Sequence, residues 1–133
     1  MKSTARILIV EDDPDDCLVF QHSILAIRPG YTVIFKDDAV QALRYLSITD
    51  QFPSLIVSDI NMPKIDGLEF RKAILAHERS ELHTVPFVFL TTAGTAFVKS
   101  RLGKINVDGI YEKPLTRAKV QEVFQDMLSK CAL

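Results

Sequence analysis

Short apolar runs alternate with amphipathic segments along most of the chain. The runs are rich in Val, Ile, Leu, Phe and Tyr, a composition typical of strands that are buried in a sheet. They occupy residues 6–10, 31–35, 55–58, 87–90 and 109–112. Because polar residues rarely interrupt these runs, we expect a parallel sheet that is covered on both faces.

The segments between the runs carry apolar residues at helical spacing, together with residues that favour helix ends. Asp13 is a suitable cap for a helix that begins at Pro14. The acids Asp15 and Asp16 suit the positive end of the same helix. Pro and Gly should end it near residues 28–30. Further helices are predicted from about Asp38, over residues 68–77, near residues 97–105, and after Pro114.

Five strands with four helical crossovers and a final helix make a (βα)5 chain. We therefore predict an α/β protein with a flavodoxin-like, doubly wound parallel sheet in three layers. Strand order 2-1-3-4-5 is the common solution at this length, with its switch point between the first and third strands. At 133 residues and 15.0 kDa the chain fits one domain. We expect that domain to span residues 1–133, with no output domain after it.

Composition excludes several classes of protein. The sequence is 47% hydrophobic and 25% charged, as in an ordinary globular domain. It contains no apolar run near the ~18 residues of a membrane span and no signal-peptide pattern, so a cytoplasmic protein without a membrane partner is expected. Cys17 and Cys131 have no metal-binding spacing and are predicted to be free thiols.

The charge is small overall but unevenly distributed. The net charge is −1, with −4 on residues 1–66 and +3 on residues 67–133. Specific nucleic-acid binding is not expected, because its usual mark is a strong basic excess. Basic residues do gather on the last two predicted helices, where a partner or homodimer face and an ordinary solvated face are both open interpretations: Lys99, Arg101, Lys104, Arg117 and Lys119.

Chemically matched side chains follow four of the five predicted strands. Glu11 and Asp12 follow the first strand and Asp59 follows the third. Thr91 and Lys113 follow the fourth and fifth. The carboxyl ends of parallel strands are where sites are built, and the predicted order sets the first strand beside the third. We therefore expect all five side chains at one crevice.

This set of side chains suits a cation-assisted reaction of a phosphoryl group. Carboxylates within about 5 Å repel each other by roughly 3 kcal/mol per pair at an effective dielectric near 20, so a proton, a lysine or a metal must offset them. Oxygen ligands without His or Cys favour Mg²⁺, or Mn²⁺, over zinc. With Lys113 and the Thr91 hydroxyl on phosphoryl oxygens, Asp59 would be placed to attack phosphorus and form an aspartyl phosphate.

The sequence resembles the receiver domains of two-component response regulators from about residue 5 to 131. The motifs that carry the resemblance are Ile-Leu-Ile-Val-Glu-Asp-Asp at residues 7–13, Asp59 followed by Met-Pro-x-x-Asp-Gly at residues 62–67, Thr91, and Lys113-Pro114. Each motif alone is weak evidence, but all four in order at these intervals are very specific. The chain is most similar in kind to stand-alone receivers.

The resemblance implies a role for each site residue. Asp59 would be the phosphoacceptor, while Thr91 and Lys113 contact phosphoryl oxygens. Asp12, Asp59 and the Asn61 backbone carbonyl would bind Mg²⁺ directly. The Glu11 carboxylate would act through a bound water. The Lys113–Pro114 peptide bond would be cis, as is usual in the family.

The resemblance also implies the partners. A sensor histidine kinase or a phosphotransfer protein would supply the phosphoryl group from a phosphohistidine, and an unidentified protein would be the downstream target. The domain would catalyse its own phosphorylation and dephosphorylation without turning over a separate substrate, so we do not expect an enzyme. One departure is Ile110, because receivers that switch through an aromatic residue usually carry Tyr or Phe three residues before the lysine. Tyr111 should face the opposite side of the sheet.

Three other functions remain to be weighed. A receiver that binds partners without phosphorylation is the first. A Mg²⁺-dependent phosphatase with an Asp nucleophile is less favoured, because it needs Asp-x-Asp where this chain has Asp59-Ile60-Asn61. A flavodoxin-type cofactor module is disfavoured by the five acids in residues 11–16. Asp66 is interpreted as part of a turn and helix start, outside the site.

Overall fold

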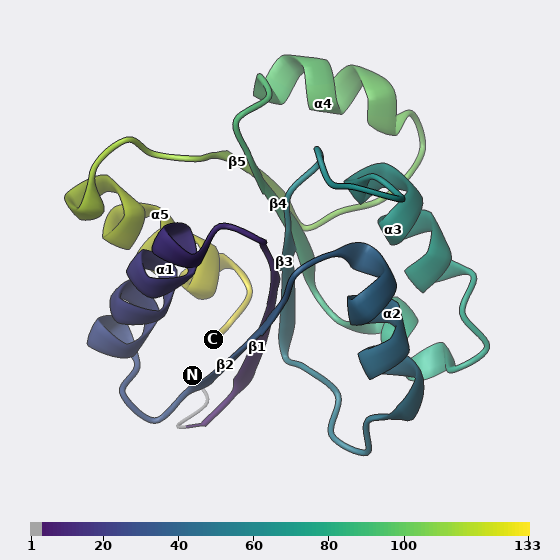
Figure 1. The fold of residues 1–133 in the computed structure, drawn as a ribbon, viewed down its shortest axis with the longest axis horizontal. Coiled ribbons are helices and arrows are strands. Elements are labelled where there is room, and N and C mark those ends of the chain that lie inside the picture. The colour runs from purple at the N-terminus through teal and green to yellow at the C-terminus, as the bar shows by residue number, and fades with distance from the viewer. Residues whose placement is uncertain (1–3) are drawn as a thin grey trace.

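The computed structural model describes residues 4–133, in which five strands alternate with five α-helices (Figure 1). The strands are β1 (Arg6–Val10), β2 (Thr32–Lys36), β3 (Leu55–Ser58), β4 (Phe87–Thr91) and β5 (Gly109–Glu112). The helices are α1 (Pro14–Ile27), α2 (Ala39–Ile48), α3 (Gly67–Leu75), α4 (Thr95–Leu102) and α5 (Arg117–Lys130). A short 3₁₀ helix, η1 (Ser80–Thr84), precedes β4.

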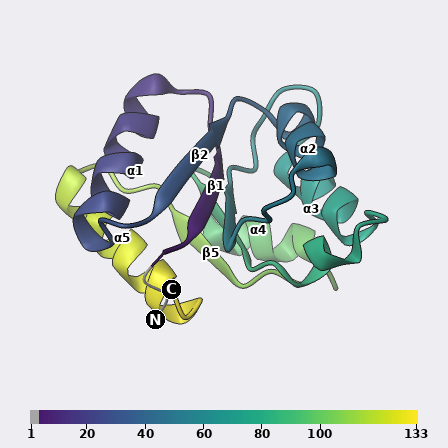
Figure 2. The same ribbon diagram turned by 90° about the horizontal axis from the view of Figure 1, so that it is seen from below.

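The strands form one parallel sheet in the order β2-β1-β3-β4-β5, which confirms the predicted flavodoxin-like topology. Helices α1 and α5 cover one face, and α2, α3 and α4 lie on the other, so the three predicted layers are present (Figure 1 and Figure 2). Val10 at the end of β1 pairs in register with Ser58 at the end of β3. The residues that follow these two strands therefore leave the sheet side by side.

Alternate residues of the strands supply two separate cores. Ile7, Ile9 and Val57 face α1 and α5, where the rings of Phe20 and Phe124 lie 5.5 Å apart and tilted by 58°. Leu8, Ile56 and Phe87 belong to the opposite cluster, which includes Phe70 and Leu46. Full burial of such a side chain contributes about 1.5–3 kcal/mol to folding. The near-continuous apolar strands of the sequence are explained by these two covered faces.

Side chains at the helix starts satisfy the first backbone amides. Asp13 Oδ1 accepts hydrogen bonds from the amides of Asp15 and Asp16, as predicted for the cap of α1. Thr116 caps α5 in the same way. Asp66 and Glu69 form a reciprocal capping box at the start of α3, which agrees with the turn and helix-start interpretation of Asp66.

The structure differs from the sequence-based expectations in three local respects. Helix α4 begins at Thr95 and ends at Leu102, earlier than predicted, and α3 ends at Leu75. The 3₁₀ helix was not predicted, because five residues carry no helical periodicity. The cis Lys113–Pro114 bond implied by the resemblance is not observed: every peptide bond in the described part of the chain is trans. No helix among residues 4–133 is long and apolar enough to cross a membrane.

Gly67 at the start of α3 is required by a close backbone approach. A Cβ atom at this position would lie 2.2 Å from the carbonyl oxygen of Asp59 and 2.9 Å from Cα of Ile60. The Gly67 amide also donates to the Ile60 carbonyl at 2.8 Å. Helix α3 therefore begins directly against the backbone that carries Asp59.

We expect Gly67→Ala to destabilise the protein by about 1–3 kcal/mol, because the added methyl group must displace backbone atoms. Urea unfolding measures the change. Gly94→Ala is the matched control: a Cβ there meets nothing within 4 Å, and its φ of −61° suits alanine. The control should stay within about 0.5 kcal/mol of wild type. Equal stability of the two variants would contradict the close approach at Gly67.

Candidate functional site

Lys113 joins three carboxylates at the carboxyl edge of the sheet. Its ammonium donates a short hydrogen bond to Glu11 Oε1 and lies 3.4 Å from Asp59 Oδ2. Asp16 Oδ2 is 3.5 Å from the same nitrogen. The structure thus brings together three of the side chains predicted from sequence, Glu11, Asp59 and Lys113, which come from three different strand ends.

Backbone hydrogen bonds hold these side chains in place. The Glu11 amide donates to the Lys36 carbonyl at 3.0 Å, and the Lys113 amide donates to the Thr91 carbonyl at 2.8 Å, so both residues continue the strand pairing. Glu11 Oε2 accepts from the Asp12 amide at 3.1 Å. Asp59 Oδ1 accepts from the Ile60 amide at 2.6 Å. One oxygen of Asp59 is therefore held by the backbone, while the other faces the ammonium.

The charges of the site are strongly coupled. Glu11 is only 6% exposed, and burial raises its pKa although the hydrogen bond and charge of Lys113 act to lower it. Burial would lower the pKa of Lys113, but its hydrogen bond to Glu11 and the charges of Asp59, Glu11 and Asp16 outweigh burial and raise that pKa. Lys113 is therefore a fixed positive charge at any physiological pH.

The remaining predicted residues surround this cluster. Asp12 and Asn61 are exposed at the same edge, and the Asn61 amide lies 3.4 Å from Asp59 Oδ1. Thr91 is fully buried, and its hydroxyl accepts a hydrogen bond from the Ala93 amide at 3.2 Å. The Thr91 hydroxyl is thus engaged with the loop that leads to α4 and does not take part in the hydrogen bonds of Lys113.

The donor set fits a hard divalent cation. The available ligands are the carboxylates of Glu11, Asp12 and Asp59 and a backbone carbonyl, all of them oxygen atoms. Within residues 4–133 no three His, Cys, Asp or Glu side chains are already grouped as a metal site. The Lys113 ammonium stands between two of the acids instead. A cation held by these oxygens would add to the charge compensation that Lys113 supplies.

Asp16 is a member of the cluster that sequence reasoning missed. Its position in the first turn of α1 was attributed to the helix dipole alone. The topology contains the missing signal, because α1 packs beside α5 and the loop before α5 carries Lys113. This packing brings the first turn of α1 to the lysine.

Ile110 and Tyr111 occupy opposite faces of β5, as predicted. Ile110 packs against the cluster under α2, α3 and α4. Tyr111 packs against the α1 and α5 cluster, and its hydroxyl donates to Asp126 Oδ2 at 2.9 Å. The aromatic ring of β5 is therefore tied to α5 and lies away from the loop that follows Thr91.

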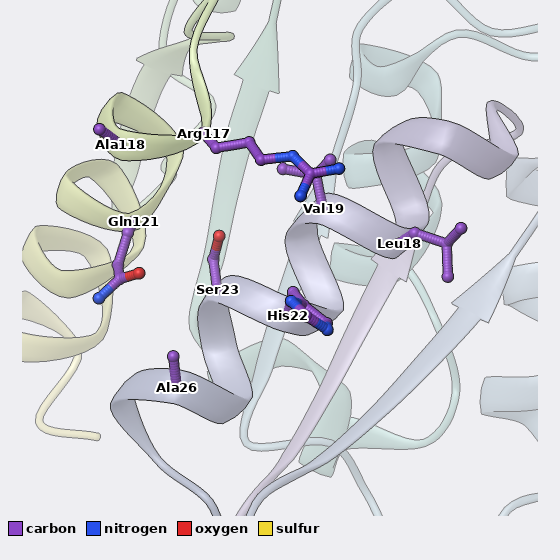
Figure 3. Close-up of a pocket in the computed structure, with 8 residues that line it drawn as sticks. All are labelled: Leu18, Val19, His22, Ser23, Ala26, Arg117, Ala118 and Gln121. Carbon is purple, nitrogen blue, oxygen red and sulfur yellow. The ribbon is translucent and has the colours of Figure 1, made fainter.

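A groove between α1 and α5 adjoins the cluster. It has a volume of about 390 Å³, and residues of both helices line it (Figure 3). Arg117 reaches from α5 towards α1 in this view, and Leu18 points away from the helix pair. A smaller hollow of about 120 Å³ shares Val19 and Arg117 with the groove and is lined also by Asp16 and Lys113. The groove thus lies next to the hollow that Asp16 and Lys113 line.

We expect Lys113→Met to raise the pKa of Glu11 further, because the hydrogen bond and charge of Lys113 that lower it disappear, while burial and the charge of Asp16 remain. The carboxyl ¹³C shift of Glu11 against pH measures this. A raised native pKa means that the folded state holds its proton longer than the unfolded state. The variant should therefore lose stability as pH rises from the ordinary glutamate value to the raised one.

Lys119→Met is the control for that titration, since Lys119 is exposed and paired with Glu122 at 3.4 Å, away from Glu11. It should leave the Glu11 titration unchanged. A Glu11 pKa that does not move in Lys113→Met would show that the ammonium has no electrostatic hold on this carboxylate.

Comparison with known proteins gives curated relatives of several kinds, which include a chemotaxis protein, a transcriptional regulator and a sensor histidine kinase. The chain is 26% identical over 121 residues to a probable chemotaxis protein CheY of Rhizobium etli, covering 90% of this chain and 89% of the relative. Other curated relatives are longer, and the chain spans about half of them.

Solved structures share the fold. The phosphorylated cyanobacterial phytochrome response regulator RcpA superposes with a TM-score of 0.84 at 22% identity, covering 95% of this chain and 92% of that one. The Mn²⁺-bound form of response regulator Rcp1 has a TM-score of 0.80 at 25% identity, covering 94% and 92%. A family model described as the response regulator receiver domain matches residues 7–125. With that span, the parallel sheet and the acids and lysine at its carboxyl edge, the chain belongs to the response regulator receiver domain family of two-component signalling.

Proposed function

We propose that the protein is a phosphoacceptor receiver in which Asp59 accepts a phosphoryl group from a phosphohistidine, with Mg²⁺ as cofactor. The observation that supports this most directly is the position of Asp59 Oδ2, 3.4 Å from the Lys113 ammonium, while Oδ1 is held by backbone amides. A nucleophile oriented by amides beside a fixed cation is suited to a reaction that needs positioning and charge neutralisation.

In the proposed reaction a carboxylate oxygen of Asp59 attacks phosphorus as the phosphorus–nitrogen bond of the donor breaks. The imidazole keeps the electron pair and takes up a proton from solvent. Lys113 stays protonated and balances charge on the phosphoryl oxygens. The Thr91 hydroxyl would leave the Ala93 amide for a phosphoryl oxygen and carry the start of α4 with it.

Asp12, Asp59 and the Asn61 carbonyl would hold Mg²⁺ directly, and Glu11 would hold it through water. Bound metal would neutralise charge on the transferring group. The metal found in Rcp1, a relative at 25% identity, supports this assignment. Water would later hydrolyse the aspartyl phosphate, so the domain resets itself and turns over no separate substrate. Its output would be altered binding of a downstream protein.

The phosphodonor would be a sensor histidine kinase or a phosphotransfer protein that docks in the groove between α1 and α5. The groove shares Val19 and Arg117 with the hollow that Lys113 lines, so a protein seated there would lie next to the lysine that contacts Asp59. Two exposed apolar residues flank this route: Leu18 is 64% exposed and Leu115 is 100% exposed. Such residues are suitable anchors for an apolar helix face.

Asp59→Asn should abolish phosphorylation. We expect intact-mass analysis after incubation with acetyl phosphate and Mg²⁺ to show one added phosphoryl group on wild type and none on the variant. Chelation of Mg²⁺ should remove the gain from wild type. Asp50→Asn is the control, since Asp50 is exposed and precedes the amino end of β3, whereas Asp59 follows its carboxyl end. Absence of any gain in folded wild type, also with a histidine kinase as donor, would favour a receiver that binds partners without phosphorylation.

Leu18→Glu should distinguish protein phosphodonors, which must dock, from the small phosphodonor acetyl phosphate. We first choose a histidine kinase or phosphotransfer domain that phosphorylates wild type. Its phosphorylation of the variant should be slower by tenfold or more, because burying the new carboxylate in an apolar contact should weaken docking by about 1.4 kcal/mol or more. Phosphorylation by acetyl phosphate should not change. Ile48→Glu, at an exposed apolar position on α2, is the control. Equal slowing with both donors would place Leu18 in the chemistry and not in docking.

A further inference from the structure

The loop between β3 and α3 contains a strained turn. Lys64 has a φ of 72°, in the left-handed region that residues with a side chain rarely adopt. The Ile65 amide donates to the Pro63 carbonyl at 2.9 Å, which closes a three-residue turn with Lys64 at its centre. A γ-turn with positive φ at its centre is rare and strained. An interaction elsewhere should hold this turn closed.

The Lys64 side chain supplies such an interaction. Its ammonium lies 3.1 Å from Oδ2 of Asp38, the residue that caps α2. Asp38 is 5% exposed, and its Oδ1 accepts from the Gln41 amide at 2.9 Å. The hydrogen bond from Gln41, followed by that from Lys64, lowers the pKa of Asp38. The carboxylate is therefore charged and fixed by α2, while the Lys64 side chain, 60% exposed, reaches to it.

The loop is pinned at both ends as well as in the middle. At one end the amides of Ile60 and Asn61 point to Asp59 Oδ1. At the other end the Gly67 amide donates to the Ile60 carbonyl. The segment between them carries the Asn61 carbonyl. With both ends fixed, the direction of this carbonyl depends on whether the turn at Lys64 stays closed.

We propose that Lys64 and Asp38 are positioning residues: their ion pair holds the strained turn closed and thereby sets the Asn61 carbonyl and the Asp59 carboxylate for Mg²⁺. This role rests on the proposed function of the site. Neither residue is among the proposed ligands of the metal or of the phosphoryl group. The pair joins the loop after β2 to the loop after β3, and the first of these loops follows Lys36, whose carbonyl accepts from the Glu11 amide.

The role predicts a local effect without a large change in global stability. The Lys64 side chain of this pair is 60% exposed, and an ion pair whose ammonium lies in solvent contributes little to the free energy of unfolding. Its loss should instead let the strained turn open while the sheet and helices stay folded, since local openings cost less than unfolding. A purely structural pair would change unfolding without changing the loop.

Two single substitutions remove the ion pair with little other change. Asp38→Asn removes the charge and keeps an oxygen that can cap α2. Lys64→Asn removes the ammonium, and asparagine tolerates positive φ. Lys64→Arg keeps the charge and should behave as wild type. Lys104→Asn is the control, because Lys104 is an exposed turn lysine remote in sequence from this loop.

Two readouts test the pair. In Mg²⁺-free protein, hydrogen exchange of the Ile65 amide should quicken by about two- to fivefold in Asp38→Asn and Lys64→Asn, the size expected for an ion pair whose ammonium is in solvent. Mg²⁺ titration followed by amide shifts should show affinity weakened by a similar factor. The double variant should lose no more than either single variant, because both remove the same interaction.

The outcomes separate this inference from the proposed function. If wild type binds Mg²⁺ and is phosphorylated while both single variants match it in Ile65 exchange and metal affinity, the positioning role is overturned and the proposed function stands. If wild type neither binds Mg²⁺ nor accepts a phosphoryl group, the proposed function is overturned, and the positioning role with it. Faster exchange and weaker binding in both variants, restored in Lys64→Arg, would support the role.

Discussion

The ammonium of Lys113 is the group on which the carboxyl edge of the sheet depends. Glu11 is buried and leaves the sheet beside Asp59, and Asp16 approaches from α1. Like charges this close repel strongly where water is scarce. A single lysine, placed by the pairing of β4 with β5, pairs with all three and compensates part of their charge. The arrangement also orients the phosphoacceptor candidate, with one oxygen towards the ammonium and the other towards a backbone amide.

Much of the architecture could be predicted because it depends on local pattern. The apolar runs predicted the strands, Asp13 marked a helix start, and the strand order is the common one for a doubly wound sheet of this length. Glu11, Asp59 and Lys113 could be brought together on topology alone. The periodicity of apolar residues indicates the strands and helices, and the position of a residue at a strand end indicates which residues share the site.

The rest depended on side-chain direction and tertiary packing. Asp16 reaches the lysine only because α1 lies against α5. The pairing of Lys64 with Asp38 joins residues 26 positions apart, and the positive φ of Lys64 has no mark in the sequence. The role of Thr91 towards a phosphoryl oxygen stays a prediction, and the hydrogen bond that its hydroxyl accepts from the Ala93 amide was not anticipated. Rotamers and loop turns of this kind follow from the assembled structure.

The tight contact at Gly67 has a mechanical consequence. There is no room for a single carbon atom between helix α3 and the carbonyl of Asp59. The two backbones are therefore in direct contact and cannot approach each other further. A rotation or slide of α3 must therefore be accompanied by a shift at the end of β3. Conversely, a displacement of the Asp59 backbone must also move the start of α3. Because of this glycine, helix α3 and the backbone of Asp59 move as one unit.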